Sequence, residues 1–214
     1  MDLAKALESF NRKERNLLIR DILGYVDGTP PMDPEFRERL ENAVELPKDS
    51  LEGAWWTTDF HFDWLAGALL TFMKPNSKPH DRDNISGPLD SWLIMANQED
   101  IDLVVVPRAP EEGTQHHLIL VEAKSYGHFS REQYNSKLRR LELLRALYKE
   151  LEGDSPHKIC FHHVLCSPNK PKKLSVRHHM KLNLPKTSVL VVKTSRDKNA
   201  EGKERVVRWK CEPR

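Results

Sequence analysis

The sequence has few cysteines and no long apolar run. It contains three cysteines in 214 residues, a small and odd number that argues against a disulfide framework and favours a reducing compartment. No stretch approaches the ~18 consecutive apolar residues that a membrane-spanning helix needs. The first residues also lack the apolar segment of a secretory leader. We therefore expect a cytoplasmic protein that does not enter a membrane.

Internal repeats are absent too, and no composition shift marks a second domain. Hydrophobic residues make up 38% and charged residues 31% of the chain, which suits one polar domain that can still bury a core.

The net charge of +2 hides an asymmetry along the chain. Residues 155–214 contain 15 lysines and arginines against four acids, a net charge of +11, which leaves −9 on residues 1–154. A basic end suits a polyanion such as nucleic acid, although a solubilising surface would have the same composition.

Two apolar runs near the middle of the chain border charged residues. Residues 101–106 (IDLVVV) and 118–121 (LILV) are rich in β-branched and aliphatic residues, which predicts strands buried on both faces. Side chains alternate along a strand, so Glu122 and Lys124 share one face. If the two strands pair as a hairpin, Asp102 comes alongside Glu122.

Such a pairing places two carboxylates and one lysine at the end of a buried strand, where charge is costly unless it is paired or bound to metal. Carboxylates bind Mg²⁺ or Mn²⁺, and such a metal lowers the pKa of a bound water and neutralises a phosphate. A lysine can hold the attacking water or offset charge on the phosphoryl oxygens. Alternatively, Glu122 and Lys124 form a surface salt bridge, although the preceding run is very apolar for an exposed strand.

The spacing of Asp102, Glu122 and Lys124 (D-x₁₉-E-x-K) resembles the PD-(D/E)xK, or restriction endonuclease-like, nuclease superfamily. The tripeptide alone is a weak signal, and its specificity comes from the order of strand, acid, strand, E-x-K and helix over residues 92–168. Two flanking segments are also similar to an uncharacterised subgroup of that superfamily: FNRKER (10–15) and DFHFDW (59–64).

One departure from the family pattern is that no proline precedes Asp102. The residues there are Asp100 and Ile101. Because Asp100 lies on the same face of the predicted strand as Asp102, Asp100 could be the ligand instead.

The resemblance implies an α/β (α+β) fold with an αβββαβ core, in which helices flank a mixed central sheet. It also implies Mg²⁺- or Mn²⁺-dependent hydrolysis of phosphodiester bonds in nucleic acid, with DNA favoured over RNA, by a protein that can be a homodimer. Asp102 and Glu122 would hold the metal, and Lys124 would assist the water. We expect a single domain over residues 1–214, with a helical addition (1–53), a core (54–168) and basic C-terminal strands (169–214).

The N-terminal segment predicts a helix over residues 2–23, ended by Gly24. Its apolar stripe consists of Leu3, Leu7, Phe10, Leu18 and Ile22. Glu14 falls on this stripe, and nucleases of the resembled superfamily often draw an extra metal ligand from such a helix. Glu14 could equally close a capping box with Asn11. A second helix should begin after Asp33 and bury Phe36, Leu40 and Val44.

A further helix is predicted to begin at Thr58 or Asp59 and to pack Leu65 and Phe72 inward. His61 lies on its apolar stripe, as a core histidine or as a ligand, and Asp59 or His61 would lie near the metal cluster. The adjacent Trp55 and Trp56 favour core packing over base stacking. We expect the first core strand at residues 91–97, with Gln98 and Glu99 in the turn that borders the site.

Residues 130–151 predict a long amphipathic helix that opens with a capping box formed by Ser130 and Gln133. The superfamily commonly places a glutamine or lysine here, facing the phosphate or the catalytic lysine. The resemblance therefore suggests Gln133 or Lys137 for this role, while a purely capping role for Gln133 is equally compatible with the sequence.

The remainder of the chain predicts a fourth core strand over residues 158–165, then two strands at 187–194 and 205–211 that extend the sheet. Cys160, His162, His163 and Cys166 raise a structural zinc site as an alternative, with His178 and His179 further on, but their spacing matches no common zinc motif. A basic loop at 169–181 is the expected contact for phosphates, through Lys170, Lys172, Lys173, Arg177 and Lys181.

Three functions are compatible with these features. The first is a metal-dependent nuclease of the PD-(D/E)xK type. The second is a catalytically inactive, nuclease-like module that binds nucleic acid or a protein partner, and it predicts a broken set of acids. The third is a zinc-stabilised interaction protein. The complete set of Asp102, Glu122 and Lys124 favours the first.

Overall fold

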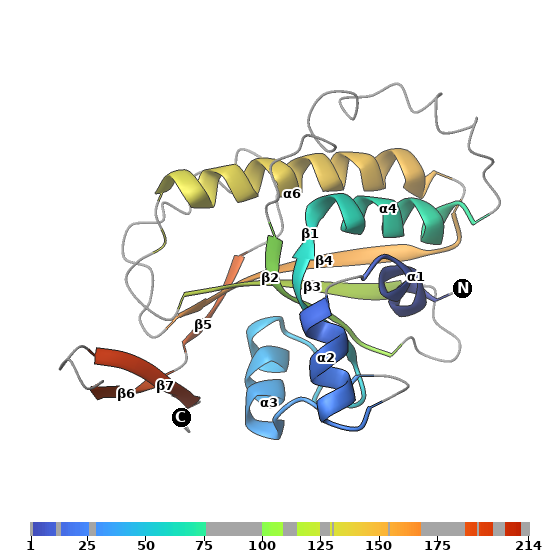
Figure 1. Cartoon of the computed structure of the whole chain (residues 1–214). Coiled ribbons are helices and arrows are strands. Elements are labelled where there is room, and N and C mark those ends of the chain that lie inside the picture. Colours follow the sequence, from blue (N-terminus) through green and yellow to red (C-terminus); the bar gives the residue numbers. More distant parts are fainter. Residues whose placement is uncertain are drawn as a thin grey trace.

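A mixed five-stranded sheet forms the centre of the computed structural model (Figure 1). Its strands lie in the order β1-β2-β3-β4-β5, with β1–β2 and β2–β3 antiparallel and β3–β4 and β4–β5 parallel. The strands span Trp55–His61, Asp100–Val106, Gln115–Ala123, Lys158–Ser167 and Thr187–Val191. The structure describes residues 2–11, 14–25, 29–75, 100–108, 115–124, 129, 131–153, 155–167, 187–191, 193–198 and 204–210.

Helices cover both faces of this sheet, as expected for a mixed α and β protein. Helices α4 (Phe62–Met73) and α6 (Arg131–Glu152) lie over one face, and α3 (Pro34–Ala43) lies on the other (Figure 1). The sheet has a hydrophobic core on each face, and side chains of β3 alternate between the two. Leu118 and Leu120 pack on the α4 and α6 side, whereas Ile119 and Val121 pack on the α3 side. The apolar run in β3 is therefore buried on both faces, as its sequence predicts.

Helix α6 confirms the predicted amphipathic pattern. Its buried residues are Tyr134, Leu138, Leu141, Leu144, Leu147, Tyr148 and Leu151. The Tyr148 hydroxyl accepts a hydrogen bond from the Ile159 amide at 2.9 Å and donates one to Glu152 at 3.0 Å. These bonds join the last turns of α6 to the start of β4, so the C-terminal end of the crossover from β3 is fixed to the parallel strand β4.

The expected single helix over residues 2–23 is wrong. The chain forms α1 (Leu3–Phe10) and α2 (Glu14–Ile22) instead. Asn11 is extended between them (φ −77°, ψ 101°), and its side-chain amide Nδ2 donates to the Thr57 hydroxyl at 2.7 Å. This tie to β1 ends α1, so α2 does not continue its apolar stripe, and Leu18 and Ile22 are 60% and 73% exposed.

The first strand of the sheet also differs from the prediction. Residues Trp55–His61 form β1, and α4 begins one turn later than expected, with His61 rather than Thr58 or Asp59 as its N-cap residue. The β-branched and aromatic sequence WWTT favours the strand, whereas the sequence prediction extended the helical pattern through it. The predicted strand at residues 91–97 lies outside the described residues.

The tryptophans of β1 belong to the core, as predicted. Trp55 packs against the core under α4 and α6, and Trp56 packs against the core under α3. The Trp56 indole also donates to the Pro30 carbonyl at 2.7 Å. The predicted helix after Asp33 is confirmed as α3. Asp33 caps it by accepting a hydrogen bond from the Phe36 amide, and Leu40 is fully buried.

The C-terminal strands divide between two sheets. Strand β5 joins the main sheet beside β4 and buries Leu190, as expected. Strands β6 (Lys193–Lys198) and β7 (Glu204–Lys210) pair only with each other in the described part of the chain. The expectation that residues 205–211 extend the main sheet is therefore wrong. Strand β7 pairs instead with β6, and the polar sequence of β6 (KTSRDK) offers no apolar residues to pack on the main core. Among the described helices, none is long and apolar enough to cross a membrane.

Candidate functional site

The predicted hairpin partners Asp102 and Glu122 lie side by side. Leu103 on β2 pairs with Val121 on β3, and continuing this antiparallel register by one residue places Asp102 opposite Glu122. Asp102 Oδ2 accepts a hydrogen bond from the Ala123 amide at 2.7 Å. Both carboxylates lie on the sheet face that α6 covers, because Leu118 and Leu120 occupy the same face of β3.

Glu122 is a nearly buried carboxylate, with only 5% of its surface exposed. Burial is the main cause that raises its pKa from 4.5 to about 7; Lys137 opposes this shift, and Asp102 adds to it. The Lys137 ammonium reaches from α6 to contact Glu122 Oε2 and donates to the Asp100 carbonyl at 3.1 Å. Lys137 therefore supplies the positive charge in contact with this acidic cluster.

Lys124 lies two residues beyond Glu122, where alternation places it on the same face of the strand. Its side chain is half-buried. Its amide donates to the Cys166 carbonyl at 2.9 Å, so the pairing of β3 with β4 continues past the last residue of β3. The backbone that carries Glu122 and Lys124 is thus held by a strand on each side.

Strand β1 carries Asp59 and His61, the two residues that were predicted to lie near the metal cluster. His61 Nδ1 is paired with Asp100 Oδ1, and the His61 ring packs edge-on against Trp64 with ring centroids 4.3 Å apart. Asp59 has a positive φ of 52° and lies between the pairs Thr58–Leu103 and Phe60–Ile101, which places it beside Asp102. Aspartate is one of the few residues that tolerate this left-handed conformation, and such strain clusters at functional sites.

The other predicted site residues are placed differently. Glu14 is exposed in the first turn of α2, and the predicted continuous stripe that would carry it toward the site does not form. Gln133 lies in the first turn of α6, but its side chain is outside the described part of the structure. Also outside the described residues are Glu99, Lys170, Lys172, Lys173, Arg177 and Lys181.

The donor atoms at this site suit a hard cation. Asp102 and Glu122 offer carboxylate oxygens, and Asp100 offers its carbonyl, all on adjacent strands. Oxygen ligands of this kind are those that Mg²⁺ and Mn²⁺ accept. The contact between Glu122 and Lys137 shows that the cluster already attracts one positive charge.

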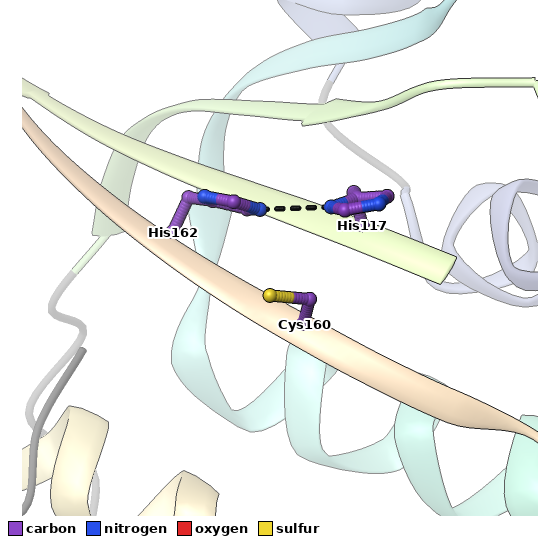
Figure 2. Close-up of side chains that lie close together, drawn as sticks. All are labelled: His117, Cys160 and His162. Atoms are coloured by element: carbon purple, nitrogen blue, oxygen red, sulfur yellow. Dashed lines mark hydrogen bonds between the residues drawn. The ribbon is translucent and has the colours of Figure 1, made fainter. Parts of the chain in front are cut away.

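A second cluster of polar side chains lies on the opposite face of the sheet. His117 on β3 and Cys160 and His162 on β4 point toward one another (Figure 2). His117 Nδ1 and His162 Nε2 are 2.9 Å apart and share a hydrogen bond. The sequence raised Cys160 and His162 as candidate zinc ligands but not His117, because His117 becomes their neighbour only when β3 and β4 pair in parallel.

The chain was compared with protein-family models, curated proteins and solved structures. No protein-family model, no curated protein and no solved structure matches the chain.

Proposed function

We propose that this protein is a metal-dependent nuclease that hydrolyses phosphodiester bonds, with DNA as the favoured substrate. The observation that carries the proposal is the pair of Asp102 and Glu122, two carboxylates on adjacent strands at the same edge of the sheet, with Lys124 two residues beyond Glu122 in the chain. A buried carboxylate beside a second, half-buried one is costly to maintain for folding alone. A role in binding a cation provides a reason for it.

The order of elements supports the same proposal. Strands β1, β2 and β3 form an antiparallel meander, α6 crosses over, and β4 returns parallel to β3. This order is similar to the βββαβ part of a restriction endonuclease-like core, in which the second strand carries the first acid and the third strand carries the E-x-K sequence. Here these positions correspond to Asp102 on β2 and to Glu122 with Lys124 at the end of β3.

In this proposal, each residue has a defined task. Asp102 and Glu122 would hold Mg²⁺ through their carboxylate oxygens, and Glu122 is 5% exposed. The metal would supply a water of lowered pKa and would offset phosphate charge. Lys124 orients the attacking water and stabilises the negative charge that develops on the phosphoryl oxygens.

A cleavage assay tests this proposal. Wild-type protein and the Lys124→Ala and Asp102→Asn variants are incubated with supercoiled, linear and single-stranded DNA, in Mg²⁺, in Mn²⁺ and in EDTA. We expect metal-dependent cleavage by wild type that falls at least 100-fold in both variants, a typical loss for a group acting in the transition state. Lys48→Ala removes an exposed lysine from a turn and serves as the matched control that should keep full activity.

Failure to cut DNA would direct the same assay to RNA substrates. Failure on both would overturn the nuclease proposal. Cleavage that survives in Lys124→Ala and Asp102→Asn would show that the activity belongs to another site or to a contaminant.

The contact between Lys137 and Glu122 favours a second candidate, a catalytically inactive module that binds nucleic acid or a protein partner. An ammonium that neutralises the acidic cluster can replace a metal as the charge partner. Calorimetric titration with Mg²⁺ separates the two candidates. Binding that is lost in Asp102→Asn supports the nuclease, and absence of binding to folded wild type supports the inactive module.

A further inference from the structure

The cluster of His117, Cys160 and His162 is built by the register of two parallel strands. His117 pairs directly with Cys160, and His162 follows two residues along β4, on the same face. This face is the one that α3 covers further along the sheet, because Ile119 and Val164 join the core of α3. The acidic cluster occupies the other face, so the two sets of ligands do not share a side chain.

The distances within the cluster are close to those of a tetrahedral metal site. One ligand atom from each side chain lies within 4.8 Å of the other two, and the two imidazole nitrogens are 2.9 Å apart. Metal bonds of ~2.0–2.1 Å to nitrogen and ~2.3 Å to sulfur at tetrahedral angles require about 3.3 Å between nitrogens and about 3.6 Å between nitrogen and sulfur. A metal would therefore require side-chain rotations that separate the two nitrogens by about 0.4 Å and bring the sulfur to about 3.6 Å from them.

The exposure of the three side chains also suits metal binding. All three side chains are half-buried, and Cys160 is a free thiol, so a metal can reach them from solvent.

We propose that His117, Cys160 and His162 form a binding site for a borderline-soft divalent metal, with Zn²⁺ as the natural occupant and a fourth position open to water or to an external ligand. Nitrogen and sulfur ligands select Zn²⁺ over Mg²⁺. A metal here joins β3 to β4 and stabilises the folded chain by mass action. This site does not depend on the proposed nuclease function.

A second histidine pair, formed by His116 on β3 and His157 just before β4, provides an internal comparison. His116 Nε2 and His157 Nδ1 are 3.2 Å apart on the α4 side of the sheet, where both rings contact Phe72. Among the described residues, the only group of three metal-ligating side chains is the one at Cys160. Two histidines without a thiolate bind a metal more weakly and give no thiolate-to-cobalt absorption band. A variant of this pair therefore serves as a control for adventitious metal binding by histidines.

Cobalt spectroscopy on the full-length chain tests the proposal. Protein stripped of metal with a chelator is titrated with Co²⁺ at neutral pH, and thiolate-to-cobalt charge-transfer absorption should develop at one equivalent. Zn²⁺ should displace it, and a large excess of Mg²⁺ should leave it unchanged. Cys160→Ser should abolish the charge-transfer band, His162→Gln should weaken Co²⁺ binding at least tenfold, and His157→Asn should bind as wild type does.

The stability of the chain provides a second measurement. Zn²⁺ should raise the melting temperature of wild type and of His157→Asn but not that of Cys160→Ser, whose folding is checked by circular dichroism. The proposal is overturned if folded wild type shows neither a charge-transfer band nor a Zn²⁺-dependent rise in melting temperature. It is also overturned if Cys160→Ser keeps the band, because another cysteine would then be the ligand.

Discussion

Replacing Lys137 by methionine removes the positive charge that contacts Glu122 while keeping a side chain of similar length. In the folded wild type the pKa of Glu122 is about 7, against an ordinary value of 4.5, and Lys137 is the main group that lowers it. The variant should therefore hold its proton on Glu122 to a higher pH than wild type. Documented buried glutamates reach a pKa of roughly 8–9.

The magnitude follows from proton linkage. Because the folded pKa of Glu122 is raised, its contribution to stability is fully present below pH 4.5 and is lost as the pH rises through about 7. At about pH 5.5 the group is protonated in both folded proteins, so the penalty of Lys137→Met contains no ionisation of Glu122. If the variant pKa of Glu122 is ~9, wild type is ionised at about pH 8.5 and the variant is mostly protonated, so ~1.5 pH units at 1.36 kcal/mol each add about 2 kcal/mol to the penalty.

Urea unfolding followed by circular dichroism, with a chelator present, measures this difference. The penalty of Lys137→Met should grow by ~2 kcal/mol between about pH 5.5 and pH 8.5, and Glu122→Gln should cancel the growth, since glutamine cannot titrate. Lys158→Met, which removes an exposed partner of Glu152, is the matched control and should show little dependence on pH. A penalty that stays constant with pH, or a growth that persists in the Glu122→Gln background, would refute this account of the acidic cluster.

Two further predictions concern the crossover helix. Leu144→Ala should lower the free energy of unfolding by about 2–5 kcal/mol in urea, because Leu144 is fully buried between α6 and the sheet; a loss below ~1 kcal/mol would contradict its place in the core. Tyr148→Phe should cost about 1–3 kcal/mol, because it leaves the buried Ile159 amide without its acceptor. Hydrogen exchange should show that amide losing protection in the variant, and unchanged protection would contradict the bond.

The sequence pattern predicted correctly those helices and strands whose local preference is the same as the structure that tertiary packing imposes. The buried stripe of α6, the apolar runs of β2 and β3 and the capped start of α3 all confirm their predictions. The segment WWTTDFH carried two conflicting signals, since its aromatic and β-branched residues favour a strand while its last residues continue the helical pattern of α4. Pairing with β2 decides the outcome, and a pairing partner 45 residues away leaves no local signal in the sequence.

At the candidate site, too, contacts between residues distant in the chain could be predicted only in part. The proximity of Asp102 and Glu122 could be predicted, because a hairpin between two adjacent runs has few registers that keep both apolar faces buried. The contact between Lys137 and Glu122 depends on how α6 rotates over the sheet. The approach of His117 to Cys160 depends on the parallel register of β3 and β4 across the crossover. Neither is encoded in the spacing of neighbouring residues.

Strand β3 joins the two candidate metal sites through its alternation. Even-numbered positions carry Glu122 and Lys124 to the face under α6, and odd-numbered positions carry His117 to the opposite face. One face therefore offers oxygen ligands for a hard cation, and the other offers nitrogen and sulfur ligands for a softer one. Nitrogen and sulfur ligands favour Zn²⁺ over Mg²⁺, so Mg²⁺ at the proposed acidic site should not displace Zn²⁺ from the opposite face of the strand. A one-residue slip of β3 against β4 would exchange the two faces and disrupt both sites together.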